Sequence, residues 1–484
     1  MKYFDIEHEV AAYFHKYQQI ELHQMKMCGE GRISMSMSPA YWLSSDERTG
    51  GMSCDTYTYH IYKEREEILC KVEVKRLEAV CRENEHALEI EKIQWDTIQV
   101  MKPVPYGRNN PFEKIGEYPD LPLKGNASDK DYFAIRNLQN MFFEHRLHEM
   151  EKLFSVKEDT VLTAECLKMN AVCGKKKILE SFAGWLEKEQ KNNHCYLFLG
   201  ITGMPLIEMT ETGESAKGIF MTQIYQIKAG LLGSDVDNWR LVRTMAVTET
   251  EYCREAGEWK IHKMKIQNLA SLPETPYRND GRYDKSGMSD EPWDVNQVMR
   301  CQPDTETAME IENIINRWVY GCRRGALREF IEKYMKNSEQ KNHMLIRSFG
   351  KTTPELNDYE AIERKIDDMT QQYRERFFTF HAPTTPVLTY GPKKKYILGT
   401  WFDTAATNLR SMAESLEDIP YMVFVNKYVH KFEKIDGHWY LTDFYCEPII
   451  SLQDWRFDMV HSKGYINASK TGKYPKRFEL QGEK

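Results

Sequence analysis

The stretch FFTFHAPTTPVLTYGPKKKYILGTWFD, from Phe377 to Asp403, contains the histidine and aspartate best placed in this chain to do chemistry together. It reads as a β-hairpin with its turn in YGPKKKY, and the midpoint between His381 and Asp403 is Pro392 in that turn. Facing residues of a hairpin have position numbers with a constant sum. With the turn centred at Pro392, His381 and Asp403 are therefore predicted to be direct cross-strand neighbours, with Cβ atoms about 5 Å apart. A slip of one residue would put the two side chains on opposite faces of the sheet.

Such a pair supports acid–base chemistry. An aspartate that accepts a hydrogen bond from one imidazole nitrogen fixes the tautomer and leaves the other nitrogen to act as acid or base. The pair can then remove a proton next to a carbonyl group and return a proton to a leaving hydroxyl. The alternative is that His381 makes only a structural hydrogen bond on a half-buried strand.

The hairpin belongs to a pattern that occurs more than once in the 484 residues. Gly218 and Gly399 are 181 residues apart in matching stretches, and Trp259 and Trp439 are 180 apart. Upstream, LHEMEKLF precedes LREFIEKY by 180 residues. In both segments, apolar residues at helical spacing come first and runs of period two follow. We therefore predict an α+β class, with helices packed on one face of an antiparallel sheet.

Three segments are expected on this pattern: 1–110, 125–280 and 300–470. The first has one helix, Ile6 to Met27, where the others have two or three, so we interpret it as a truncated copy. Its incomplete helical layer leaves sheet that another part of the chain or a second chain must cover.

The copies differ at the two positions of the candidate pair. The second segment has Gly200 and Thr222 there, and the first has Ser34, with Asp55 only close to the second position. The third segment alone keeps both residues, so it is the candidate for catalysis.

Composition narrows the function classes. The chain is 41% hydrophobic and 29% charged with a net charge of −7, and no block of Lys and Arg follows an aromatic run. We therefore expect no nucleic acid and no membrane among its partners. No apolar run approaches the roughly 20 residues of a membrane span, and the start lacks the core of a signal peptide, so a cytoplasmic location is expected. The eleven cysteines form no CxxC pair and no phosphate-binding loop occurs, so we expect no metal and no cofactor.

The order of elements resembles the nuclear transport factor 2-like fold, and within it the SnoaL-like branch. The motifs that carry the resemblance are HAPTTPVL, YILGTWF and DGHWYLTDFY, and it covers most of 300–460, much of 130–280 and the later half of the first segment. It implies tandem cone-shaped units, each a curved antiparallel sheet wrapped on helices, whose open end holds a small apolar ligand. Relatives of this kind include scytalone dehydratase, bile-acid dehydratases and ketosteroid isomerase.

The resemblance also implies roles for residues. It makes His381 the catalytic acid and base, with Asp403 orienting it. Those dehydratases carry a tyrosine and, five residues later, an aspartate on the first helix. Trp318 and Arg323 occupy these positions here, so the second carboxylate is missing.

A phenol is then expected to polarise the carbonyl oxygen, and the candidates are Tyr320, as a catalytic residue, and Tyr445. The residues expected to contact the substrate are Trp318, Arg323, Trp401 and Tyr445. The function implied is a cofactor-free lyase, such as a dehydratase, or an isomerase, acting on a hydrophobic cyclic small molecule with a carbonyl group. The alternative is a non-catalytic protein that binds small molecules or assembles, as a homo-oligomer for example.

Overall fold

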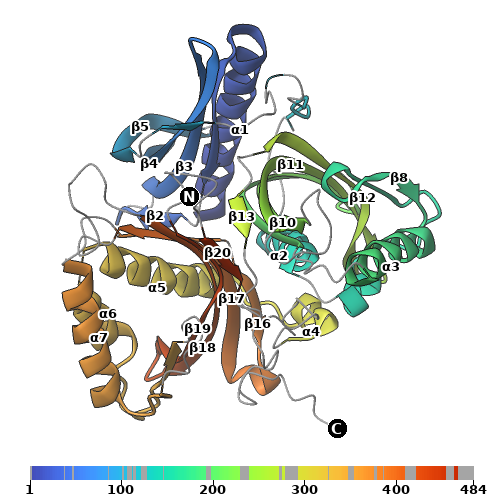
Figure 1. Ribbon diagram of the computed structural model, residues 1–484. Helices are drawn as coiled ribbons and strands as arrows, with labels where there is room; N and C mark the ends of the chain where they lie inside the picture. The colour runs from blue at the N-terminus through green and yellow to red at the C-terminus, as the bar shows by residue number, and fades with distance from the viewer. Residues whose placement is uncertain are drawn as a thin grey trace. The chain divides into compact units, whose positions relative to one another are not determined.

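The computed structural model of the chain describes residues 3–36, 39–45, 48–85, 87–100, 103–105, 112, 116–121, 128–144, 147–191, 198–228, 239–271, 275–277, 293–324, 326–346, 354–374, 379–384, 386–408, 421–453 and 463–466. Two compact units make up the chain: Met1–Gly230 with Arg240–Glu274, and Leu231–Trp239 with Thr275–Lys484. Both are mixed helical and β units with curved sheets (Figure 1). The first takes in the first two predicted segments, whose separate boundaries remain a prediction.

The first compact unit begins with helix α1 (Tyr3–Cys28), which confirms the helix predicted from Ile6 to Met27. Its buried apolar side chains recur at helical spacing, among them Ile6, Val10 and Phe14. Gly29 ends the helix with a φ of 68°, and its N–H donates to the Met25 carbonyl at 3.1 Å. Only glycine adopts this left-handed conformation freely, so the residue type explains the stop.

A sheet follows α1 in the order β1-β3-β4-β5, with β2 added to β3 and β6 to β4. The strands are β1 (Glu30–Ser36), β2 (Ala40–Leu43), β3 (Thr49–Glu64), β4 (Glu67–Glu83), β5 (Leu88–Val100) and β6 (Val104–Pro105).

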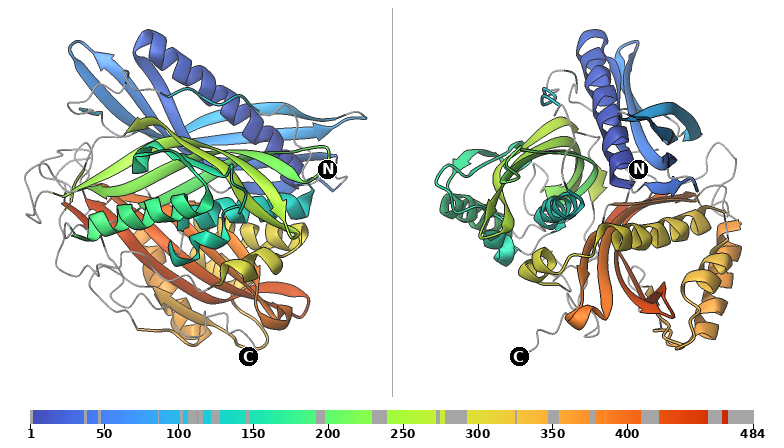
Figure 2. Two further views of the ribbon diagram at one scale, coloured as in Figure 1. Left: turned by 90° about the vertical axis from the view of Figure 1, so that its right-hand side faces the viewer. Right: turned by 180° about the vertical axis from the view of Figure 1, so that it is seen from behind.

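The rest of the first compact unit contains a second curved sheet, in the order β9-β10-β11-β12-β7-β8. Its elements are α2 (Asp129–Glu144), η2 (Leu147–Lys152), β7 (Val161–Ala164), η3 (Glu165–Leu167), β8 (Met169–Cys173), α3 (Lys175–Lys191), β9 (Phe198–Met209), β10 (Ser215–Lys228), β11 (Trp239–Glu255) and β12 (Glu258–Ser271). Helix α2 lies inside the curve of β10, β11 and β12 (Figures 1 and 2).

The first segment packs against the second within this unit. The His15 ring on α1 lies 2.7 Å, through Nε2, from the Met204 carbonyl oxygen on β9. On β10, the Gln223 side chain donates to the Tyr59 hydroxyl at 3.3 Å. The truncated first segment is thus buried in part by its neighbour along the chain.

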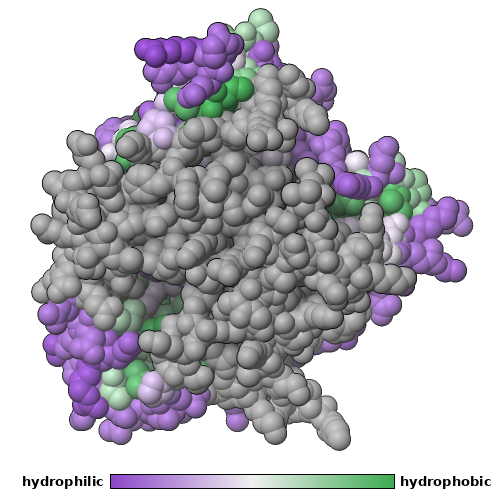
Figure 3. All heavy atoms as spheres, viewed as in Figure 1, coloured by the Kyte–Doolittle hydropathy of each residue, from purple (hydrophilic) through white to green (hydrophobic). Residues whose placement is uncertain are grey.

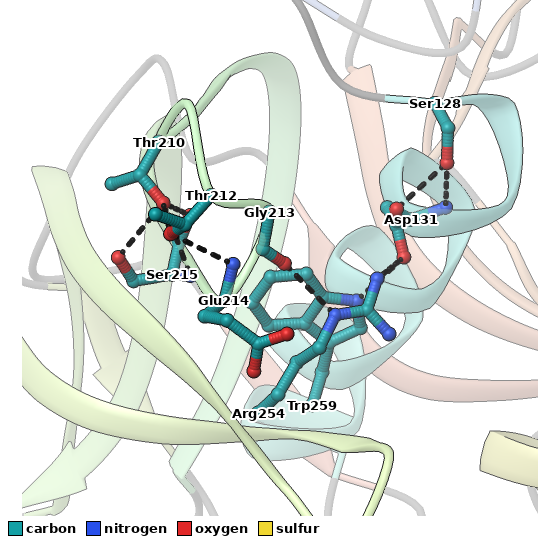
Figure 4. Close-up of polar contacts among 9 residues, drawn as sticks. All are labelled: Ser128, Asp131, Thr210, Thr212, Gly213, Glu214, Ser215, Arg254 and Trp259. Carbon is teal, nitrogen blue, oxygen red and sulfur yellow. Dashed lines mark hydrogen bonds and ion pairs between the residues drawn. The ribbon is translucent and has the colours of Figure 1, made fainter.

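A polar cluster fixes the start of α2 to two hairpin turns (Figure 4). The Asp131 carboxylate accepts hydrogen bonds from the Arg254 guanidinium and, at 3.0 Å, from the Trp259 indole. Arg254 also donates to the Gly213 carbonyl at 2.9 Å, and its guanidinium lies 4.5 Å from the centre of the Trp259 ring. These contacts join α2 to the β9–β10 and β11–β12 turns.

In the second compact unit, helices again precede most of the strands. Its elements are β13 (Thr275–Tyr277), α4 (Val295–Arg300), α5 (Thr305–Arg324), α6 (Leu327–Tyr334), β14 (His343–Ile346), α7 (Tyr359–Arg374), β15 (Thr379–Pro383), β16 (Val387–Tyr390), η5 (Pro392–Lys394), β17 (Tyr396–Asn408), β18 (Tyr421–Ile435), β19 (His438–Gln453) and β20 (Lys463–Ile466). The sheet runs β15-β17-β18-β19-β20, with β16 paired to β17 and β14 parallel to β19. On the face seen in Figure 3, the described residues where α6 and α7 lie are mostly hydrophilic.

Three hairpins each contain two register shifts, which mark β-bulges. The β4–β5 register shifts after Val74 and again after Val80. The β11–β12 pair shifts after residues 245 and 251, and the β18–β19 pair after residues 425 and 431. Each pair of bulges is six residues apart, and the last two sets differ by the 180 residues found in the sequence. Because bulges set the local bend of a strand, this shared spacing supports the predicted repeat.

None of the described helices is long and apolar enough to cross a membrane.

Candidate active site in the third segment

His381 and Asp403 come together on adjacent strands of the second compact unit. In the antiparallel pair β15–β17, His381 faces Ala405 and Asp403 faces Pro383. The two side chains are therefore diagonal neighbours on one face, and Nδ1 of His381 lies 2.7 Å from Oδ2 of Asp403. The predicted contact is confirmed, but the predicted direct pairing is wrong by two residues.

The turn and one register shift together explain the difference. The Gly391 N–H donates to the Tyr396 carbonyl at 2.8 Å, so the turn closes around Lys393 and Lys394 instead of Pro392, and this moves the pairing of β16 with β17 by three residues. The register then shifts back by one residue between β16 and β15, so the net shift at His381 is two residues. A shift of two residues along one strand keeps side chains on the same face, since their direction alternates with period two. His381 and Asp403 therefore share one face of the sheet although the predicted centre of the turn is wrong.

The Asp403 carboxylate is almost fully buried, with 1% of its side chain exposed, whereas 11% of His381 is exposed. Besides His381, its Oδ2 accepts hydrogen bonds from the Tyr428 hydroxyl at 3.2 Å and from the Asn426 amide at 3.4 Å. A buried carboxylate needs such donors, because burial removes it from water. Held this way, Asp403 selects the tautomer with a proton on Nδ1 and leaves Nε2 as the proton acceptor.

Sequence reasoning missed Asn426 and Tyr428. Strand β18 contains the period-two run YMVFVNKYVHKF, in which Asn426 faces Asp403 and Tyr428 faces Trp401. The alternation along this run was the signal that could have identified Asn426 and Tyr428, because every second residue of a strand lies on the same face of the sheet.

Two residues expected to contact the substrate, Trp401 and Trp318, lie on the same side of the sheet as the His381–Asp403 pair. Trp401 shares its sheet face with Asp403, two positions along β17, and is buried. Trp318 extends from α5 to the same layer, where its ring centre lies 4.7 Å from that of Phe444. Phe444 faces His430 across β18 and β19.

Tyr445 lies on the opposite face, which corrects the expectation that it acts beside His381. It pairs with Val429, whereas its neighbour Cys446 pairs with Tyr428 on the Asp403 side. Its hydroxyl donates to Glu447 at 2.6 Å, and its ring belongs to a buried cluster with Leu345, Leu398 and Val429. Tyr445 therefore cannot contact a substrate held by His381.

Tyr320 and Arg323 belong to the last turns of α5, and their side chains lie outside the described residues. Their expected roles as phenol donor and substrate contact remain predictions.

The matching positions of the other segments hold no such pair. In the second segment, a Cβ on Gly200 would lie 2.0 Å from the Phe143 ring, so that ring fills the place of an imidazole. In the first, Asp55 pairs with Arg76 at 3.0 Å on the face opposite Ser34. Among the described residues, no group of three or more histidine, cysteine or acidic side chains could hold a metal ion.

Comparisons with known proteins gave weak likenesses. No family model matches the chain, and no curated protein does. Among solved structures, a type 2 hexachlorocyclohexane dehydrochlorinase is 12% identical, with a TM-score of 0.25, over 31% of this chain and 88% of that one. A candidate scytalone dehydratase from Novosphingobium aromaticivorans is 11% identical, with a TM-score of 0.25, over 32% and 90%. Aln2 from a Streptomyces species is 11% identical, with a TM-score of 0.24, over 30% and 94%. These TM-scores are too low to support an inference about activity.

Proposed function

We propose that the third segment is a cofactor-free lyase, such as a dehydratase, or an isomerase, acting by acid–base chemistry on a hydrophobic cyclic molecule with a carbonyl group. The observation that carries this proposal is the 2.7 Å contact between His381 and the buried Asp403. The first two segments would be scaffolding in tandem with it, since neither has a matching pair.

In the lyase form of the reaction, Nε2 of His381 takes a proton from the carbon next to the carbonyl group. The electrons of the broken C–H bond form the enolate. The imidazolium then returns this proton to the β-hydroxyl, which leaves as water while the C=C bond forms. An isomerase would return the proton to a different carbon.

Asp403 has a positioning role in this scheme. It keeps the proton on Nδ1, and its negative charge stabilises the imidazolium that forms during proton transfer. Tyr320 is the proposed donor to the carbonyl oxygen, with Trp318, Trp401 and Arg323 as substrate contacts.

The rival is a non-catalytic binding or assembly protein. The observation in its favour is that one Asp403 oxygen collects donors from His381, Tyr428 and Asn426, as a structural polar cluster would. In that case His381 holds β15 against β17 and transfers no proton.

Turnover separates the two functions. The test incubates a panel of β-hydroxy ketones of one to three rings with the full chain and detects loss of water by mass spectrometry. We expect His381→Ala to lower the rate at least about 100-fold, as for loss of a general acid–base residue.

A matched control is His262→Ala. This histidine also pairs with an aspartate, at 3.0 Å from Asp159, but far along the chain from the candidate site. Equal turnover by His381→Ala and the control would remove His381 from the mechanism and favour the binding protein.

A further inference from the structure

In both complete copies of the repeat, the strand that follows the last hairpin turn accepts a short parallel strand along its outer edge. In the second segment, residues 263–266 of β12 pair with β7 (Val161–Ala164). In the third, residues 443–446 of β19 pair with β14 (His343–Ile346). Both short strands lie between helices of their own copy. The first segment lacks this part, because α1 leads directly to β1.

The register of the sheets identifies the equivalent edge in the first segment. On β5, Lys92 pairs with Val80 next to the second register shift of its hairpin. Lys263 on β12 and Asp443 on β19 occupy the same place beside the second shift of their own hairpins. Because the bulges mark equivalent positions, residues 92–95 of β5 match the two stretches that accept β7 and β14.

The outer edge of β5 has no strand beside it among the described residues. β5 is the last strand of its sheet, with β4 on its inner side (Figures 1 and 2). Ile93 and Trp95 on this strand are partly exposed, whereas Met264 and Phe444, which match Ile93 in the complete copies, are at most 2% exposed. An edge strand presents unpaired N–H and C=O groups. β5 therefore offers both hydrogen bonds and apolar surface to an added strand.

The side chains of β5 determine what such a strand must carry. Ile93 and Trp95 lie on the face that α1 covers, where the Trp95 ring centre is 5.4 Å from that of Tyr17. Apolar side chains at alternate positions of an added strand would be buried beside them. Asp96 lies on the opposite face, is exposed, and accepts a hydrogen bond from the Gln94 amide at 2.9 Å. A basic side chain beside Asp96 would complement its charge.

The direction of pairing distinguishes a partner segment from a second copy of this chain. Both internal examples are parallel. Two copies of one edge strand that meet across a two-fold axis run antiparallel, so β5 of a second copy does not reproduce this arrangement. The strands β7 and β14 are already paired within their own copies. The occupant that fits is therefore an extended segment of another protein.

We propose that residues 92–96 of β5 bind an extended segment of a partner protein as an added parallel strand. This segment has apolar side chains beside Ile93 and Trp95 and a basic side chain beside Asp96. Main-chain hydrogen bonds provide the affinity of such a complex, and the alternate side chains provide its specificity. The edge belongs to the other compact unit from His381, so this inference does not depend on the proposed function.

The chain itself supplies a probe, the peptide NHMLIR of residues 342–347. In the register of β14, its methionine and isoleucine lie beside Ile93 and Trp95, and its arginine lies beside Asp96. Fluorescence anisotropy compares labelled NHMLIR with NHMLIE on the full chain. We expect NHMLIR to bind at least about 2-fold more tightly, and Asp96→Lys to reverse this preference. The control Glu66→Lys, in the exposed β3–β4 turn, should leave it unchanged.

Hydrogen exchange locates the added strand. NHMLIR should slow the exchange of the β5 amides around residues 92–96 and leave those of β12 and β19 unchanged. Several results would overturn the proposal: no saturable binding below about 1 mM, a preference that Asp96→Lys does not alter, or protection of β12 or β19 in place of β5. So would β5 amides that are fully protected in the free chain, since another part of the chain or, where protection rises with protein concentration, a second copy would then cover the edge.

Discussion

At the scale of single residues, Asp403 is a buried carboxylate that orients the proposed catalytic histidine. It is surrounded by donors and holds Nδ1 of His381 at 2.7 Å, so its charge determines how the imidazole is held. An amide at this position would keep the shape of the side chain but could present its NH₂ group to the donors.

We predict that Asp403→Asn lowers turnover at least about 100-fold with the fold preserved, because the imidazole loses its fixed tautomer. Circular dichroism checks the fold, and rates on the ketone panel check the activity. The matched control is Asp159→Asn, which removes the partner of His262 and should leave the rate unchanged. Loss of activity in the control as well would contradict a specific role for Asp403.

His430 gives a prediction about acid stability. Burial lowers its pKa from 6.5 to about 3, so the unfolded chain binds a proton that the folded chain excludes. The folded state is favoured above the unfolded pKa, and this stability is lost as pH falls from about 6.5 towards 3, by about 1.4 kcal/mol per pH unit. Urea unfolding of wild type and His430→Phe at pH 7 and pH 5 measures the difference.

The free energy of unfolding of the wild type should fall more than that of His430→Phe between these two pH values. His15, whose pKa burial also lowers to about 4, lies in the other compact unit and serves as the internal comparison. Equal pH dependence of wild type and variant would show that His430 is not excluded from protonation.

At the scale of elements, the packing of α2 on β9 decides what the second segment can do. Gly200 lets the Phe143 ring lie directly on the strand. We predict that Gly200→Ala lowers the free energy of unfolding by about 1–3 kcal/mol, as overpacking of a core does. Thermal and urea unfolding of the full chain measure this change.

Two variants accompany this prediction. Phe143→Ala combined with Gly200→Ala should lose less stability than the sum of the two single changes, because Phe143→Ala removes the clash and the new methyl group at position 200 fills part of the void. Gly184→Ala, on α3 where a new Cβ meets nothing within 4 Å, should stabilise the helix by up to about 1 kcal/mol. Strict additivity at positions 143 and 200 would mean that the ring does not block this site.

Helices, strands and the contact between His381 and Asp403 could be predicted from the sequence. The period-two alternation placed His381 and Asp403 on one face despite a misplaced turn, since an error of two residues preserves the face. Tyr445 was misplaced because its residue type carries no information about which face it takes, and that depends on the register with Val429. The sequence does not single out His430, because the absence of a hydrogen-bond partner for its ring among the described residues depends on how the interior packs.

At the scale of the whole molecule, the chain has two compact units, each with its own core. We predict two unfolding transitions in the full chain, because a core that unfolds on its own gives its own cooperative step. Hydrogen exchange during urea unfolding, read peptide by peptide, assigns each transition. Gly200→Ala should shift the transition of the β9 and β10 peptides, and His430→Phe that of the β18 peptides. A single transition shared by all peptides would contradict this independence.

The Phe143 ring on Gly200 also bears on how activity can be gained or lost along such a chain. A histidine introduced at position 200 meets the ring before it can find an acidic partner, and a smaller residue at 143 alone leaves a void in the core. Either change alone is therefore expected to destabilise the second segment. Directed evolution of a second active site would have to change positions 143, 200 and 222 together.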